Sequence, residues 1–168
     1  MATPTNLPAT FVAGNVLTAA QMNDLRGAFR VLQVVTASQG SGVTNSTTTL
    51  ADTGLSVSIT PQSATSKILV YVAQNGVYKI GAGGGVVLAL LRGASVLTYF
   101  AAGAAYTGDA AENTVSSSCV FLDSPATTSA VTYKTQFSNR VAVAQAAVQA
   151  GVGVGTPDSY ICAMEISA

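Results

Sequence analysis

The sequence predicts an all-β protein, an antiparallel and jelly-roll-like β-sandwich preceded by an extended N-terminal arm and one short α-helix. Apolar and polar residues alternate along several short runs; Leu55, Val57 and Ile59, for example, are separated by serines. This period of two is typical of strands with one buried face. Turn-forming residues interrupt the runs about every 8–12 residues, as in sandwiches and barrels. We place residues 1–30 in the arm and helix and residues 31–168 in the sandwich.

The N-terminal part begins with a predicted arm over residues 1–16, whose prolines and glycine disfavour regular structure. A helix is expected next, because Thr18 is a good N-cap and Gln21 stands three residues later as its capping-box partner. One narrow apolar stripe marks the face that would dock: Leu17, Met22, Leu25, Phe29 and Leu32. A helix of about 12–14 residues is marginal alone. We therefore expect it to pack against sister helices or another protein, or to lie across the end of its own sandwich.

From residue 31 onward the pattern changes to that of strands. Strands are expected at residues 32–36, 46–50, 55–60, 67–77, 86–91, 96–100, 115–121, 131–137 and 160–166. The turns and loops between them fall at residues 40–45, 81–85, 92–95, 101–113 and 123–125. Residues 68–72 are apolar on both faces, which predicts a central strand. The flanking charges, Lys67 and Lys79, are expected where that strand reaches the surface.

Residues 140–154 allow two interpretations. Their alanines and the spacing of Val141, Ala144, Val148 and Val152 suit a helical stripe. Alternation also begins at Val141, and Gly151 and Gly153, with Gly155 just after the segment, would break a helix. We favour a strand followed by a loop.

The composition of the chain is poor in charge. Of its 168 residues, 8% are charged, with seven basic and seven acidic side chains, whereas 49% are hydrophobic. A typical domain has about 25% charged residues. Low surface charge suits a protein whose surface is hidden in an assembly, so we expect a homo-oligomer or packing in a virion. The alternative is a soluble monomer whose surface is Ser, Thr, Asn and Gln.

Two classes of partner are disfavoured by the same composition. The basic residues are scattered singly along the chain, and nucleic-acid binding needs a concentrated positive surface. The longest apolar run, residues 80–91, is interrupted by glycines and is shorter than the roughly 20 residues that span a bilayer. The N-terminus does not resemble a secretory signal, so folding in the cytosol is expected. Two cysteines, Cys119 and Cys162, are then expected to be buried free thiols.

The sequence gives little support for catalysis. The chain has no histidine, which removes His-based nucleophile activation and His-containing metal sites. Asp109 and Glu112 share a loop and could form an acid/base pair, although solvated carboxylates are the simpler interpretation. We expect no enzyme activity, no cofactor and no metal. The remaining candidates for surface recognition are three tyrosines beside loops: Tyr78, Tyr99 and Tyr106.

Several segments resemble a known family. The run STTTLADTGLSVSITPQSATSKILVYV, then LALLRGASVL, LDSPATTSAVTYKTQF and YICAMEIS, resemble a β-domain that recurs in bacteriophage fibre and other virion proteins. Ahead of them, GNVLTAAQMNDLRGAF is similar to a short leader found at the start of many phage tail-associated proteins. The resemblance covers residues 14–168, departs over residues 139–154, and includes no catalytic residue.

The resemblance implies a homotrimer whose N-terminal part is fixed to the particle and whose β-rich part faces outward. We therefore expect a structural protein of a phage virion, assembled in the host cytoplasm, that forms a short trimeric tail fibre, head fibre or spike. Its expected partners are other virion proteins and a host-surface glycan or protein. The alternatives are a capsid decoration protein and, from another class, a glycan hydrolase. Host, receptor and head or tail placement stay open.

Overall fold

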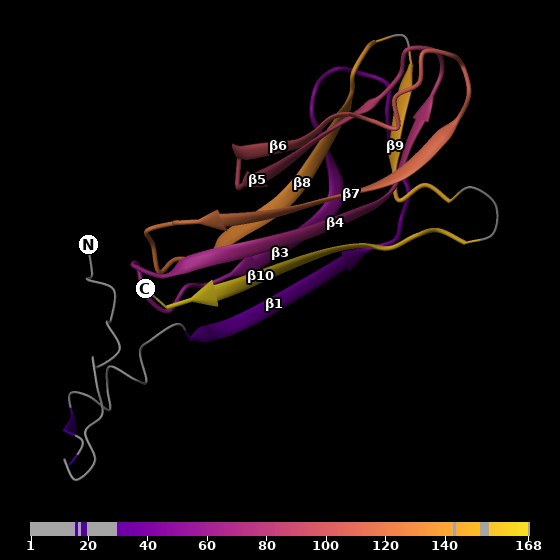
Figure 1. Ribbon diagram of the computed structural model, residues 1–168. Coiled ribbons are helices and arrows are strands. Elements are labelled where there is room, and N and C mark those ends of the chain that lie inside the picture. The colour runs from indigo at the N-terminus through magenta and orange to yellow at the C-terminus, as the bar shows by residue number, and fades with distance from the viewer. Residues whose placement is uncertain (1–15, 17, 20–29, 143, 152–154, 168) are drawn as a thin grey trace.

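The structure is a computed structural model that describes residues 16, 18–19, 30–142, 144–151 and 155–167 (Figure 1). Ten strands make up most of this part of the chain: β1 (Val31–Gln39), β2 (Val43–Asn45), β3 (Ala51–Ile59), β4 (Lys67–Ile80), β5 (Val86–Arg92), β6 (Ser95–Ala104), β7 (Asn113–Asp123), β8 (Val131–Asn139), β9 (Gln145–Val148) and β10 (Ser159–Ile166). The all-β prediction is confirmed.

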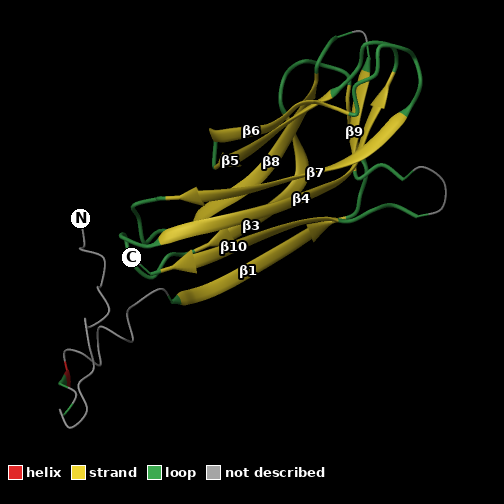
Figure 2. Cartoon of the chain, viewed as in Figure 1, coloured by secondary structure: helices red, strands yellow, loops and turns green. Residues whose placement is uncertain are grey.

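The strands form two antiparallel sheets (Figure 2). Sheet A has the order β1-β10-β4-β9-β2, and β7 pairs with β4 in addition. Sheet B has the order β3-β8-β5-β6. The sheets pack face to face, because the main apolar cluster combines residues of sheet B, such as Leu55 and Tyr133, with residues of sheet A, such as Val70 and Ile161. This two-layer arrangement agrees with the expected sandwich.

The pairing pattern is that of one long hairpin. Its tip lies at Gly93, whose φ of 58° is a conformation that glycine adopts without strain. From this tip outward, β5 pairs with β6, β4 with β7, β3 with β8, β2 with β9 and β1 with β10. The ribbon is then rolled, so that β10 also pairs with β4 and β8 also pairs with β5.

A hydrogen-bond network links the two sheets inside the core. Thr53 of β3 contacts Thr135 of β8, and the Thr135 hydroxyl donates to Gln74 of β4 at 3.0 Å. The Gln74 amide in turn donates to the hydroxyl of Ser159 at 2.9 Å. All four side chains are completely buried, and each has a partner, as buried polar groups require. A second apolar cluster, which includes Phe137 and Val148, lies elsewhere in the core.

The structure departs from the predicted elements in several places. Residues 43–45, which lie in a predicted loop, form β2. Residues 46–50, expected as a strand of β-branched threonines, form a loop instead. Asn45 holds this loop, because its side-chain oxygen accepts hydrogen bonds from the backbone N–H of Thr47 at 2.8 Å and from the Thr47 hydroxyl at 2.9 Å. Local side-chain bonding of this kind competes with strand pairing. The loop expected at residues 101–113 begins later, because β6 continues to Ala104.

The interpretation of residues 140–154 as a strand followed by a loop agrees with β9, although the strand comprises Gln145–Val148 rather than residues 141–143. Gly76 explains part of this arrangement. Its φ is 57°, and a Cβ placed there would lie 2.6 Å from the backbone nitrogen of Ala150, so glycine allows the loop after β9 to approach β4.

Most of the predicted attachment helix lies outside the described residues, including Leu17, Met22, Leu25 and Phe29. The last member of the predicted stripe, Leu32, is in β1 and not in a helix. In the part of the chain that the structure describes, no helix has the length and apolar character needed to cross a membrane. Cys119 and Cys162 are both free thiols and are half-buried.

Candidate functional site

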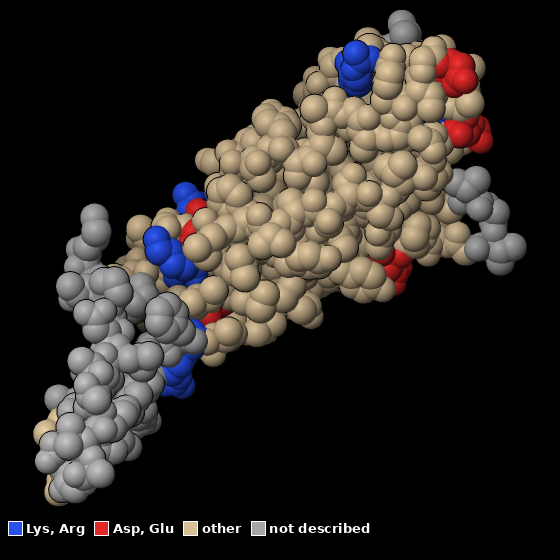
Figure 3. Space-filling model, viewed as in Figure 1, with Lys and Arg blue, Asp and Glu red and all other residues tan. Residues whose placement is uncertain are grey.

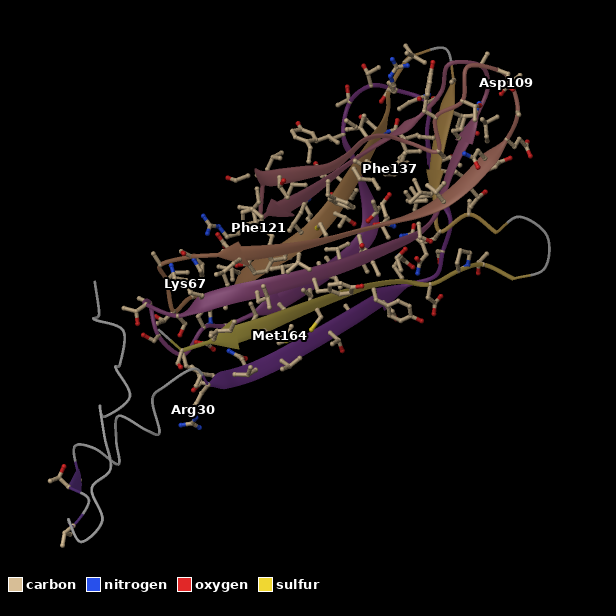
Figure 4. The ribbon with its side chains drawn as sticks, viewed as in Figure 1. Arg30, Lys67, Asp109, Phe121, Phe137 and Met164 are labelled. Carbon is tan, nitrogen blue, oxygen red and sulfur yellow. The ribbon has the colours of Figure 1, made fainter. Side chains whose placement is uncertain are left out.

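Charged side chains gather at the two ends of the sandwich (Figure 3). We call the end where β1 begins and β10 ends the stem end; it carries Arg30, Lys67, Arg92, Asp123 and Glu165. We call the opposite end, where residues 81–85 and 105–112 form loops, the loop end. Figure 4 labels Asp109 at the loop end and Arg30 and Lys67 at the stem end. Val31 therefore begins the sandwich at the stem end, and the loops of residues 81–85 and 105–112 lie at the opposite end.

At the loop end, an arginine lies over an aromatic ring. The Arg140 guanidinium is 4.7 Å from the centre of the Tyr106 ring, which is cation–π geometry. The backbone N–H of Arg140 donates to the carbonyl of Gly85 at 2.8 Å, and its guanidinium donates to the carbonyl of Gly83 at 3.3 Å. Tyr106 is 50% exposed. The pair thus offers solvent a positioned aromatic surface beside a positive charge.

A second group at the loop end joins β4 to the loop of residues 105–112. The Glu112 carboxylate lies near the Tyr78 hydroxyl and raises the pKa of Tyr78 above its usual value. The neighbouring Lys79 ammonium donates to the carbonyl of Gly81 at 3.2 Å and to the carbonyl of Asp109 at 2.7 Å. Lys79 therefore fixes the glycine-rich turn and the next loop to each other.

The expectation that Lys79 would lie at the surface is wrong. Its side chain is completely buried, because loop carbonyls replace the water that an ammonium otherwise needs. Lys67, in contrast, is exposed as expected, and its ammonium donates to the Ser124 hydroxyl at 2.7 Å.

The two loop carboxylates hold local structure. The Asp109 carboxylate accepts a hydrogen bond from the backbone N–H of Ala111 at 3.1 Å. The Thr107 hydroxyl and the Ala111 N–H both lower the pKa of Asp109. A general acid needs the opposite shift, toward the pH at which it works. Glu112 is engaged with the Tyr78 hydroxyl.

The three predicted recognition tyrosines do not form one site. Tyr78 and Tyr106 belong to the loop end, where Tyr78 is only partly exposed. Tyr99 lies on β6 opposite Ala89, on the outer face of sheet B, and is 59% exposed. The cation–π contact of the loop end, between Tyr106 and Arg140, joins residues far apart in sequence, so spacing alone gives no signal for it.

The outer face of sheet B is polar over β3 and β8, whereas its β6 part carries the exposed Val96 and Tyr99. Lys134 and Asp52 form an ion pair at 2.8 Å, and Gln136 donates to the same carboxylate at 2.8 Å. Both partners lower the pKa of Asp52, and Lys134 has the larger effect. A shallow pocket beside this pair is lined by Ser56 and Thr135 as well. The polar and charged side chains of this surface thus have partners on the surface itself.

At the stem end, Arg92, Asp123 and Glu165 are bonded inside the fold, whereas Arg30 and Lys67 are exposed. Arg92 donates to both carboxylate oxygens of Asp123, at 3.0 and 2.8 Å, and the Tyr133 hydroxyl donates to the same carboxylate at 2.7 Å. Burial, together with that bond, raises the pKa of Tyr133 strongly. No sequence pattern predicts this triad, because Asp123 lies in a predicted turn and its partners come from other strands.

Glu165 is a second bonded carboxylate at the stem end, and its side chain is completely buried. Its two oxygens accept hydrogen bonds from the Gln33 amide at 2.6 Å and from the backbone N–H of Gln62 at 2.7 Å. Burial by itself would raise the pKa of Glu165, but these hydrogen bonds outweigh it and lower the pKa.

Among the described residues, no group of three or more Cys, Asp or Glu side chains is placed to hold a metal ion. Comparison of the chain with models of known protein families and with curated proteins gives no match.

Proposed function

We propose that this chain is a structural protein of a bacteriophage virion, a short homotrimeric fibre or spike. Residues 1–30 attach it to the particle, and the β-sandwich contacts the host surface. The resemblance of the leader and of the strand segments to phage virion proteins motivates the assignment.

The observation that carries the proposal is the difference between the two ends of the domain. Val31, where the arm joins the sandwich, is paired with Ile166 at the stem end, whereas Tyr106 and Arg140 lie at the loop end (Figure 1). A protein that is attached to a particle at one end and contacts the host at the other needs this separation. Positioned aromatic rings and arginines are the groups that most often dominate recognition of other macromolecules.

We also propose that the sandwich is a jelly roll. Without the short β2 and β9, sheet A reads β1-β10-β4-β7 and sheet B reads β3-β8-β5-β6. This is the order produced when a hairpin of eight strands is rolled into two sheets. Jelly rolls occur in viral capsid and lectin domains, so the topology supports a virion protein without specifying its role.

Deletion of residues 1–30 tests the attachment role. In the phage that carries this chain, a fibre without residues 1–30 should be absent from purified particles, while the isolated sandwich should remain a soluble trimer that binds host cells and competes with phage adsorption. A full-length fibre should be found in the particles by imaging with a label. A decoration protein gives a different result, namely loss of head stability without any binding to cells.

Incubation with purified peptidoglycan or capsular polysaccharide tests the hydrolase alternative. Turnover that disappears in Asp109→Asn or Glu112→Gln would replace the structural assignment by an enzymatic one. The expected result is no product from the wild-type protein.

A further inference from the structure

The outer face of sheet A is apolar across four strands. Directly paired residues place side chains in rows across β1, β10, β4 and β7. The first row is Val34, Met164, Leu69 and Leu122; the second is Thr36, Cys162, Tyr71 and Val120; the third is Ser38, Tyr160, Ala73 and Ser118. We define the apolar face by eight of these residues: Val34, Leu69, Tyr71, Val120, Leu122, Tyr160, Cys162 and Met164.

This face is open to solvent in the single chain. Five of its large side chains are between 43% and 62% exposed: Val34, Tyr71, Val120, Leu122 and Tyr160. None of the three rows contains a charged residue, and the middle of the molecule in Figure 3 carries no charge. An apolar patch on the order of 500 Å² is at the upper limit for a monomer and marks an interaction surface.

The chemistry of the face limits what can cover it. A partner must itself be free of charge, because an unpaired charge buried against these rows would be strongly destabilising. The outer face of sheet B does not qualify, since it carries the ion pair between Asp52 and Lys134 and a row of hydroxyl groups. The apolar face of another copy of the chain does qualify. Its apolar area, on the order of 500 Å², is more than half of the roughly 800 Å² that each partner contributes to a stable interface.

We propose that the apolar faces of three copies meet around a common axis and form the subunit interface of the trimer. This inference rests on the proposed function for the number of subunits. Four strands about 4.8 Å apart make a face some 17–19 Å wide. Three such faces arranged as a triangle lie about 5 Å from its centre, which is half of the usual distance of about 10 Å between packed sheets. The width of sheet A therefore suits a filled threefold core.

Val120→Asp tests the interface. Val120 is 62% exposed in the single chain and lies on β7, an outer strand of the face. The substitution therefore leaves the core of the fold intact while it introduces a carboxylate at each of the three proposed contacts between copies. The wild-type chain should have three times its mass of 16.8 kDa by light scattering, whereas Val120→Asp should be monomeric at the same concentration. Ser58→Asp, which adds the same charge to the outer face of sheet B, should stay trimeric. Circular dichroism checks that each variant is folded, and the milder double variant Val120→Thr/Leu122→Thr replaces Val120→Asp if the latter is not.

A cross-link tests the arrangement itself. Val34 and Leu122 stand at opposite ends of one row, on the two outer strands of the face. Around a threefold axis, Val34 of each copy lies beside Leu122 of the next, so oxidation of Val34→Cys/Leu122→Cys should give covalent trimers. The unsubstituted chain controls for its two native thiols, and each single variant should give no trimer band. A face-to-face dimer would instead give covalent dimers only and would overturn the threefold arrangement.

The outcomes separate this inference from the proposed function. If the wild type is trimeric and Val120→Asp also stays trimeric, the interface assignment fails while the trimeric virion protein stands. If the wild type is monomeric, the interface fails, and imaging of labelled particles decides the virion assignment independently.

Discussion

The stem end and the loop end contain similar charged residues that serve different purposes. At the stem end, Asp123 and Glu165 are buried, and each accepts hydrogen bonds from two or more partners within the fold. At the loop end, Arg140 and Glu112 are exposed, and each contacts one tyrosine. A charged group that is buried and fully bonded inside the protein stabilises the fold, whereas an exposed charged group is available for contact with other molecules.

The largest effect should come from Asp123→Ala. The substitution leaves the Arg92 guanidinium and the buried Tyr133 hydroxyl without their acceptor. Breaking such a pair costs about 3 kcal/mol, which urea denaturation can measure. Glu112→Gln at the loop end is the matched control and should change the free energy of unfolding by less than about 0.5 kcal/mol. Equal losses in the two variants would remove the distinction between the ends.

Lys79→Met tests whether burial, and not position at one end, decides the role of a charge. Lys79 belongs to the loop end but is buried, so its loss should cost about 2 kcal/mol by leaving the carbonyls of Gly81 and Asp109 unpaired. Hydrogen exchange should become faster in residues 105–112. Lys67→Met, at an exposed position, should be close to neutral; a Lys79→Met variant as stable as the wild type would contradict the assignment.

Glu165 makes the stability of the stem end depend on pH. Because its pKa is lower in the folded chain than the ordinary value of 4.5, its contribution is complete above about pH 4.5 and is lost as the pH falls through the folded pKa. Thermal unfolding should show a lower Tm below pH 4.5. In Glu165→Gln, unfolding should be easier at neutral pH by about 1.5 kcal/mol, and this component of the acid sensitivity should disappear. A variant with an unchanged pH profile would show that other carboxylates are responsible.

Arg140→Ala should have the smallest effect on stability, below about 1 kcal/mol for an exposed cation–π pair. If the loop end contacts the host, the same variant should compete poorly with phage adsorption to cells. Tyr99→Ala, on the outer face of sheet B, provides the control and should compete like the wild type. Full competition by Arg140→Ala would exclude this pair from the contact surface.

Much of the fold could be predicted from the sequence because burial of one face imposes a period of two. The alternating residues of 55–60 and 131–137 lie in β3 and β8. The loop at residues 46–50 was missed because β-branched residues favour strands only where a neighbouring strand is present, and here Asn45 bonds the backbone instead.

The candidate sites were harder to predict, since their contacts join distant parts of the chain. Tyr106 is predicted from its place beside a loop, but its partner Arg140 comes from the segment after β8. The burial of Lys79 depends on two carbonyls, one of which is 30 positions away. Gln74 joins the two sheets through Thr135 and Ser159, which lie far from it in sequence.

The nested pairing of the strands also sets the order in which the protein can fold during synthesis. The hairpin of β5 and β6 can form as soon as both strands are made, whereas β1 must wait for β10; Gln33 and its partner Glu165 are 132 positions apart. Contacts between residues so far apart in the sequence form slowly during folding. The first strand of the sandwich is thus the last to be paired, and with it the sheet that carries the apolar face is completed only when the chain is nearly finished. A truncated chain would lack β10 and could not complete that sheet, so only full-length copies should enter the assembly.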